Sequence, residues 1–206
     1  MIVEPADVGA RGCDSLVLSQ GGTPAQMAAL KASGVDFFVG YLGSITPARL
    51  LTILAAGLAF MPVTFGGEYE DGALDEIAQL TTLGIPGPCS VWLDMEGLKA
   101  YHTDAAKLIS MINTWADGIE DAGWMPCLYV GAPQPLTSSE LHALHVVRYW
   151  KGQGRCVDRF NALAEPTNGW CMTQMWPSIA RFAPMAMVDA NMIGADYKSR
   201  VPSWVR

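Results

Sequence analysis

Two acidic residues separated by one position, Asp94 and Glu96, carry the strongest chemical signal in the sequence. They end an apolar run, 89–96, that has the composition of a β-strand. Residues two apart on a strand point to the same face, so both side chains would enter one site while Met95 packs on the opposite face. Crowding among carboxyl groups raises their affinity for protons, which lets one group donate a proton while its neighbour stays ionised.

A pair of carboxyl groups with these two roles is what cleavage of a glycosidic bond requires. One acid protonates the leaving oxygen, and one carboxylate stabilises the cationic sugar or activates water. The backbone spacing does not fix the distance between the carboxyl groups, so inverting and retaining mechanisms both stay open. An Asp-x-Glu sequence at a strand end is also common without any function, and taken alone it favours a merely solvated or backbone-bonded pair.

The elements that would position these acids alternate along the chain as short β-like runs and helix-like stretches. We expect eight strands, at 12–16, 35–42, 59–65, 89–96, 125–130, 146–150, 171–176 and 185–190. Helices are expected at 24–33, 46–57, 71–83, 103–122 and, as a short helix, from Thr137 or Ser138 onward. The sequence therefore predicts an α/β fold, a TIM-like parallel barrel of eight strands with helices mainly after the first five strands. We expect it to form one domain over residues 1–206.

Further acids fall where a parallel barrel would collect them. The carboxyl ends of the strands form the cup that holds the active site of such barrels. Asp14 lies near the end of the first expected strand and Asp189 near the end of the eighth, and these strands are neighbours in a closed barrel. Four carboxyl groups at one mouth favour a functional site over a solvated pair. The candidate catalytic residues are Glu96, Asp94, Asp14 and Asp189.

Aromatic and amide residues are expected at the same level of the barrel. Sugars stack their apolar faces on aromatic rings, while amides and acids bond to sugar hydroxyls. Each aromatic residue taken singly is more often a core residue than a ligand platform. The candidate substrate-binding residues at the strand ends are Tyr41, Tyr129, Trp150, Gln174 and Trp176.

The composition argues against several other functions. A formal net charge of −7 disfavours nucleic acid and anionic membrane surfaces as partners. No apolar run reaches the roughly 20 residues that span a bilayer, so we expect no membrane insertion. The N-terminus lacks a signal-peptide pattern, which predicts cytoplasmic synthesis and release or delivery to the cell envelope by another route. We expect a monomer.

Metal, cofactor and nucleophile chemistry lacks its usual motifs. The five cysteines form no C-x-x-C pair and have no metal-ligand spacing from a histidine, so we expect small buried residues in a reduced protein. His142 and His145 have no obvious acidic metal partner at the predicted mouth. The sequence contains no G-x-S-x-G elbow, Walker loop or G-x-G-x-x-G motif. We expect neither a metal nor a cofactor.

Several short motifs resemble those of the Chalaropsis-type lysozymes, which form glycoside hydrolase family twenty-five. They are Gly12-Cys13-Asp14, Leu93-Asp94-Met95-Glu96, Gln174-Met175-Trp176 and Val188-Asp189-Ala190-Asn191. A related glycoside-hydrolase-like family of unknown function is the closer match in the second and third strands. The residues that carry this second resemblance are Phe38-Val39-Gly40-Tyr41-Leu42-Gly43, Ala56-Gly57-Leu58 and Pro62-Val63.

The resemblance implies a trimmed barrel that acts on the glycan of peptidoglycan without a cofactor. It also implies that Glu96 is the general acid, while Asp94 stabilises the developing positive charge or orients an assisting substrate group. Asp14 and Asp189 would tune the site, and Asn191 joins the candidate substrate-binding residues.

Three functions remain open from the sequence. The first is a glycosidase, muramidase-like, that hydrolyses cell-wall glycan, as a phage-type lysin does. The second is a non-catalytic glycan-binding or structural barrel module. The third is a barrel enzyme that uses acid–base chemistry on another small molecule. Four mouth acids favour the first, because a binding module does not need two carboxylates that face one another.

Overall fold

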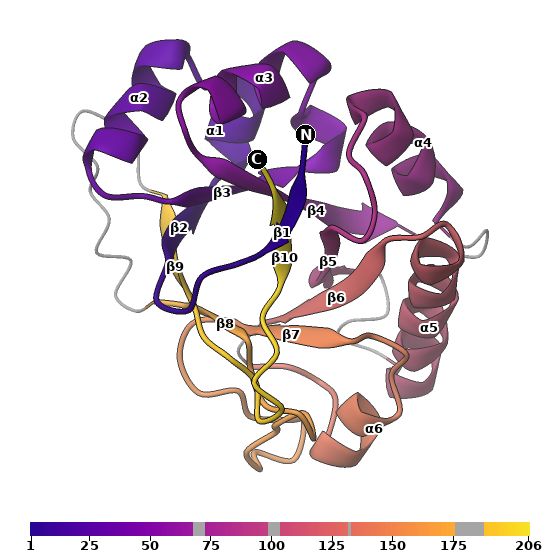
Figure 1. Ribbon diagram of the computed structural model, residues 1–206. Coiled ribbons are helices and arrows are strands. Elements are labelled where there is room, and N and C mark those ends of the chain that lie inside the picture. Colours follow the sequence, from indigo (N-terminus) through magenta and orange to yellow (C-terminus); the bar gives the residue numbers. More distant parts are fainter. Residues whose placement is uncertain (68–72, 99–103, 132, 176–187) are drawn as a thin grey trace.

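Eight strands form a closed barrel in the computed structural model, which describes residues 1–67, 73–98, 104–131, 133–175 and 188–206. In order around the barrel they are β2 (Arg11–Asp14), β3 (Phe37–Tyr41), β4 (Ala59–Gly67), β5 (Ser90–Leu98), β6 (Met125–Val130), β7 (Arg148–Lys151), β8 (Met172–Gln174) and β9 (Asp189–Ile193). Pairing of β9 with β2 completes the ring, and the predicted TIM-like α/β fold class is confirmed (Figure 1).

The last barrel strand differs from the prediction in its direction. Strands β2 to β8 pair parallel with their neighbours, whereas β9 is antiparallel to both β8 and β2. The prediction of eight parallel strands is wrong at this strand, and the barrel is mixed. Because an antiparallel strand starts at the end where its predecessor stops, the chain needs no crossover helix to reach β9. Asp189 begins β9 and therefore still lies at the mouth.

The described helices follow the first five barrel strands, as predicted, and lie outside the ring of strands in Figure 1. They are α1 (Leu16–Gly21), α2 (Pro24–Ala32), the 3-10 helix η1 (Leu42–Ser44), α3 (Pro47–Ala55), α4 (Leu74–Leu83), α5 (Ala105–Asp121) and α6 (Ser138–His142). Thr23 and Thr46 cap α2 and α3, each followed by a proline that suits the first helical turn. The short α1 was not predicted. Ser15 accepts the backbone N–H of Leu18 and starts this helix where the prediction continued a strand.

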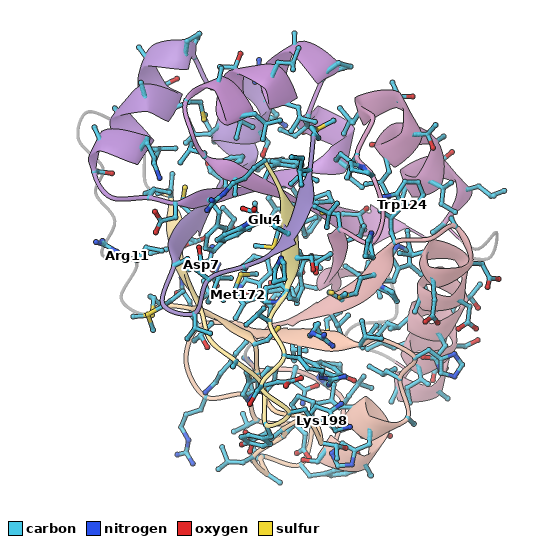
Figure 2. The ribbon with its side chains drawn as sticks, viewed as in Figure 1. Glu4, Asp7, Arg11, Trp124, Met172 and Lys198 are labelled. Carbon is cyan, nitrogen blue, oxygen red and sulfur yellow. The ribbon has the colours of Figure 1, made fainter. Side chains whose placement is uncertain are left out.

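Two short strands that the sequence analysis did not predict cover the amino-terminal end of the barrel. β1 (Val3–Pro5) pairs antiparallel with β10 (Ser203–Val205), and β10 also pairs with the start of β4. Trp204 is fully buried, with its ring centroid 5.7 Å from that of Phe37 at the start of β3. In Figure 1 this strand pair crosses the centre of the ring. Glu4, labelled in Figure 2, accepts the indole N–H of Trp204 at 3.1 Å.

Side chains along each barrel strand alternate between two apolar layers. One layer fills the barrel, and it includes Trp92 from β5 and Met172 from β8, the latter labelled in Figure 2. The other layer lies between strands and helices and includes Leu93 and Met95. Because the side-chain period of a strand is two, Asp94 points to the interior side, one step beyond Trp92. The packing of Met95 against the helices is as predicted.

The structure also bears on the cysteines and on membrane association. All five cysteines are free and buried in the structure, which confirms the expectation of small buried residues. None of the helices in the described ranges combines the length and the apolar character needed to cross a membrane.

Candidate active site

The mouth of the barrel holds a cavity of about 370 Å³ in which the predicted acids meet. Eight of the ten candidate site residues line it, together with one residue that was not predicted. The lining residues are Asp14, Tyr41, Asp94, Glu96, Tyr129, Trp150, Gln153, Gln174 and Asp189. Asn191 is bonded to Asp14 without lining the cavity, and Trp176 falls outside the described residues.

Asp94 and Glu96 enter the mouth from β5 but differ in burial. The side chain of Asp94 is 6% exposed, whereas Glu96 is exposed. An oxygen of Asp94 accepts the backbone N–H of Glu96 at 3.0 Å, which fixes the orientation of the Asp94 carboxyl group. The Glu96 carboxyl group lies against Gly131, at the end of β6, where a Cβ atom would overlap it. Only a glycine at this position leaves room for Glu96 in its present place.

Burial sets the protonation of Asp94. Removal from water raises the pKa of Asp94 from 3.8 to about 7, because the charged form loses its hydration. The negative charges of Glu96 and Asp14 contribute to this rise in the pKa, while the hydrogen bond from the Glu96 backbone opposes it. Asp94 therefore changes charge near neutral pH.

Asp14 is a second buried acid, and it faces Asp189 across the barrel seam. The two residues are direct partners in the pairing of β2 with β9, so the expected approach of Asp14 and Asp189 is observed. Burial raises the pKa of Asp14 to about 7, and the charge of Asp189 adds to the effect. Hydrogen bonds from Asn191 and Gln174 favour the charged form and partly offset it.

A chain of hydrogen bonds connects Tyr129 to Asp14. The Tyr129 hydroxyl donates to Gln174 Oε1 at 3.0 Å, and Gln174 Nε2 donates to Asp14 Oδ1 at 3.3 Å. Asn191 Nδ2 donates to the same oxygen of Asp14 at 2.7 Å. Gln174 and Asn191, both predicted to bind substrate, are buried, and each donates a hydrogen bond to Asp14. In this structure these amides orient an acid.

Gln153 is the lining residue that the sequence analysis missed. Its Nε2 donates to Asp189 Oδ1 at 3.0 Å. Gln153 therefore orients the carboxyl group of Asp189, as Asn191 orients that of Asp14. The residue lies just beyond the end of β7, after Gly152. The rule that collected the acids, polar residues at the carboxyl ends of strands, would have found it had amides beyond the predicted strand 146–150 been included.

The aromatic residues of the mouth divide into a buried and an accessible set. Trp150 is buried, and its ring meets that of Tyr129 edge-on at a centroid distance of 4.5 Å. Its buried indole nitrogen has no hydrogen-bond partner among the described residues. Tyr41 is half-buried and contacts Phe65, an exposed ring at the end of β4, in a T-shaped geometry at 6.3 Å. The accessible stacking surface therefore lies on the Tyr41 side of the mouth.

Comparison with solved structures places this arrangement among known folds. The chain shares its fold with a bacterial lysozyme. That lysozyme, from Streptomyces coelicolor, superimposes with a TM-score of 0.60 over 92% of this chain and 94% of its own, at 14% sequence identity. An uncharacterized protein from B. stearothermophilus superimposes with a TM-score of 0.67 over 90% of this chain and 96% of its own, at 18% identity.

The likeness to the lysozyme is one of fold. No protein-family model matches the chain, and a search of curated protein sequences also gives no match. Membership in the lysozyme family or in its glycoside-hydrolase-like relative therefore stays a prediction. The described residues contain no group of three or more His, Cys, Asp or Glu side chains placed to hold a metal ion.

Proposed function

We propose that this protein is a glycosidase that hydrolyses cell-wall glycan of the peptidoglycan type by carboxylate acid–base catalysis. The observation that carries the proposal is the mouth itself, where four carboxyl groups share one cavity and two of them have a pKa of about 7. Carboxyl groups that exchange protons near neutral pH are what general acid–base chemistry needs. The lysozyme-like fold supports the choice of substrate.

In this proposal Glu96 is the general acid. It is the exposed member of the pair, so it can reach the leaving oxygen of a polysaccharide lying across the mouth. A bound chain would exclude water from Glu96 and favour its neutral, proton-donating form. The group would then lose its proton to the leaving oxygen as the bond breaks.

Asp94 is proposed as the carboxylate that stabilises the cationic sugar. Because its pKa is about 7, half of the free protein molecules carry a neutral Asp94 at that pH. Positive charge that develops on the sugar favours the ionised form, so the interaction strengthens as the transition state is approached. Asp14 shares the same cavity and its charge raises the pKa of Asp94, while the charge of Asp189 raises the pKa of Asp14.

The test is release of reducing sugar from purified peptidoglycan by wild type, Glu96→Gln and Asp94→Asn. We expect each substitution to lower the rate by at least about 100-fold. Glu120→Gln, a matched change of an exposed acid on α5, should leave the rate unchanged. On an aryl glycoside whose leaving group needs no protonation, Glu96→Gln should recover most activity and Asp94→Asn should not.

Other outcomes would redirect the assignment. If only Asp94→Asn regained activity on the activated aryl glycoside, Asp94 would be the general acid and Glu96 the stabilising carboxylate. No release by wild type from several walls, across a range of pH, would contradict the proposal and favour a non-catalytic glycan-binding barrel.

A further inference from the structure

The side-chain amide of Gln174 lies between a phenol and an acid in the wall of the mouth. Gln174 is the last residue of β8, and it is 7% exposed. Its Oε1 accepts the hydrogen bond from Tyr129 of β6, and its Nε2 donates to Asp14 of β2. One buried amide with both ends bonded therefore connects side chains from three strands of the barrel.

The chemistry of the two partners fixes the direction of this amide. An ionised carboxylate can only accept hydrogen bonds, so Asp14 requires the N–H end of Gln174. The carbonyl end then faces Tyr129, whose hydroxyl supplies the matching donor. A reversed amide would place its carbonyl oxygen against the carboxylate, where both groups are acceptors and neither is satisfied. Tyr129 therefore holds Gln174 in the orientation that serves Asp14.

Both side-chain amides that reach Asp14 donate to the same oxygen. Asn191 Nδ2 lies 2.7 Å from Oδ1, and Gln174 Nε2 lies 3.3 Å from it. A carboxylate oxygen has two lone pairs, so the two N–H groups occupy both acceptor positions of Oδ1. A proton that binds Asp14 therefore goes to Oδ2, and it binds against two donors that favour the charged form.

The titratable groups that face Asp14 supply no positive charge. Its pairing partner on β9 is Asp189, whose charge raises the pKa of Asp14. The others are Cys13, which adjoins Asp14 on β2, and the cavity residues Tyr41, Asp94, Glu96 and Tyr129 from β3, β5 and β6. The described lining of the mouth contains no Lys, Arg or His. Amide N–H groups, including that of its own backbone, are thus what favours the charged form of Asp14.

We propose that Gln174 is a positioning residue that keeps Asp14 charged and, through that charge, controls how readily Asp94 ionises. The charge of Asp14 raises the pKa of Asp94 across the cavity. Once Gln174 no longer donates to Asp14, a proton binds Asp14 more tightly and the charge is lost, so Asp94 ionises at lower pH. The inference rests on the proposed glycosidase function, in which Asp94 stabilises the cationic sugar.

The protonation of each acid can be followed without any turnover. Carbon-13 NMR of the full chain, labelled at the aspartate carboxyl groups, gives the midpoints, and Asp14→Asn and Asp94→Asn assign the two signals. Gln174→Met keeps the length of the side chain without its amide. We expect it to raise the proton affinity of Asp14 by about tenfold, which is about one pH unit, and to lower the midpoint of Asp94. Tyr129→Phe, which leaves Gln174 in place, should shift both midpoints in the same directions by less.

A matched control and two contrary outcomes make this test decisive. Gln20→Met, the same substitution at an exposed residue of α1, should leave both midpoints at their wild-type values. Unchanged midpoints in Gln174→Met, or in Tyr129→Phe where Gln174→Met does not fold, would show a merely structural amide and overturn the inference. Shifts of Asp14 and Asp94 in the same direction would also overturn it, because they indicate a change in burial instead of coupled charges.

The pH profile of kcat/KM on peptidoglycan adds a measurement that depends on the proposed function. Because the proposed reaction needs an ionised Asp94, the acidic limb of the profile should move to lower pH in Gln174→Met, together with the NMR midpoint of Asp94. An acidic limb that stays in place while this midpoint moves would overturn the catalytic role of Asp94, and not the coupling of Gln174 to Asp14.

Discussion

Asp94 and Glu96 stand two positions apart on one strand, yet they meet different surroundings. Asp94 lies one step deeper, above the buried Trp92, and is shielded from water, whereas Glu96 reaches the rim. The period of a strand places both on one face, but burial raises the pKa of the deeper Asp94 to about 7. In the proposed mechanism the exposed Glu96 reaches the leaving oxygen, and the deeper Asp94 stabilises the positive charge on the sugar.

Gly131→Ala is a sharp test of how Glu96 is positioned. A Cβ atom at this position would overlap the Glu96 carboxyl group, which is the end of a flexible side chain and can rotate away at small cost. We expect kcat/KM on peptidoglycan to fall by at least about tenfold while the free energy of unfolding changes by less than about 1 kcal/mol. Gly21→Ala, where an added Cβ meets open space, is the control. Activity within twofold of wild type would show that Glu96 does not need its present place.

Asp94→Asn should change stability in a pH-dependent way. The pKa of Asp94 is raised to about 7 in the folded protein, against 3.8 for an aspartate side chain exposed to water in the unfolded chain. Between these pH values the folded protein keeps a proton that the unfolded chain has lost. The free energy of unfolding therefore falls as pH rises through this window, and the loss is complete above about pH 7. The amide cannot ionise, so we expect it to stabilise the protein by on the order of 2 kcal/mol at pH 8 and little at pH 4.

Thermal unfolding of Asp94→Asn and wild type at pH 4, 6 and 8 measures this difference. Asp7→Asn serves as a control, because the Asp7 side chain is 81% exposed. A variant that is destabilised at pH 8, or that gains equally at both ends of the range, would contradict the buried charge at Asp94. We expect the Asp94→Asn variant to gain stability and to lose activity, because the buried charge that destabilises the fold is also the charge proposed to stabilise the cationic sugar.

Among the helices and strands, the sequence predicted best those whose start is marked by residues close together in the chain. Helices α2 and α3 each begin with a threonine cap that is followed directly by a proline. Both signals for a helix start are therefore local in the sequence. The direction of β9 has no such signal, because apolar periodicity is the same whether a strand runs up or down. The short α1 was not predicted for a related reason. Its six residues are too few to show a helical periodicity that differs from the end of a strand.

For the candidate site, the sequence predicted which residues gather at the mouth better than it predicted what each side chain contacts. Placing acids, amides and aromatic residues at the ends of strands was sufficient to collect eight of the nine residues around the mouth. Which amides face a ligand and which face an acid depends on side-chain directions that spacing does not give. Gln174 and Asn191 were assigned to substrate from the sequence, and their donors are directed at Asp14.

The whole molecule is organised as a barrel open at one end and covered at the other. The mouth carries the acids, and β1 and β10 cover the amino-terminal end with Trp204. These two strands have three residues each and pair across about 200 positions of sequence, so no local pattern could reveal them. Their place opposite the mouth separates a stabilising region from a reactive one, as in other barrels of this architecture.

Trp204→Ala should therefore weaken the fold without changing the chemistry. The indole ring is fully buried against Phe37, and its N–H donates to Glu4, so its removal leaves a cavity and takes one hydrogen bond from Glu4, which keeps its ion pair with Arg206. We expect the free energy of unfolding, measured by urea denaturation, to fall by about 3–5 kcal/mol, and Trp204→Phe to lose less. At a temperature where each variant remains folded, kcat on peptidoglycan should stay within about twofold of wild type. A loss of kcat in the folded variant would mean that the covered end influences the mouth, because no residue of β10 lines the mouth cavity in the described chain.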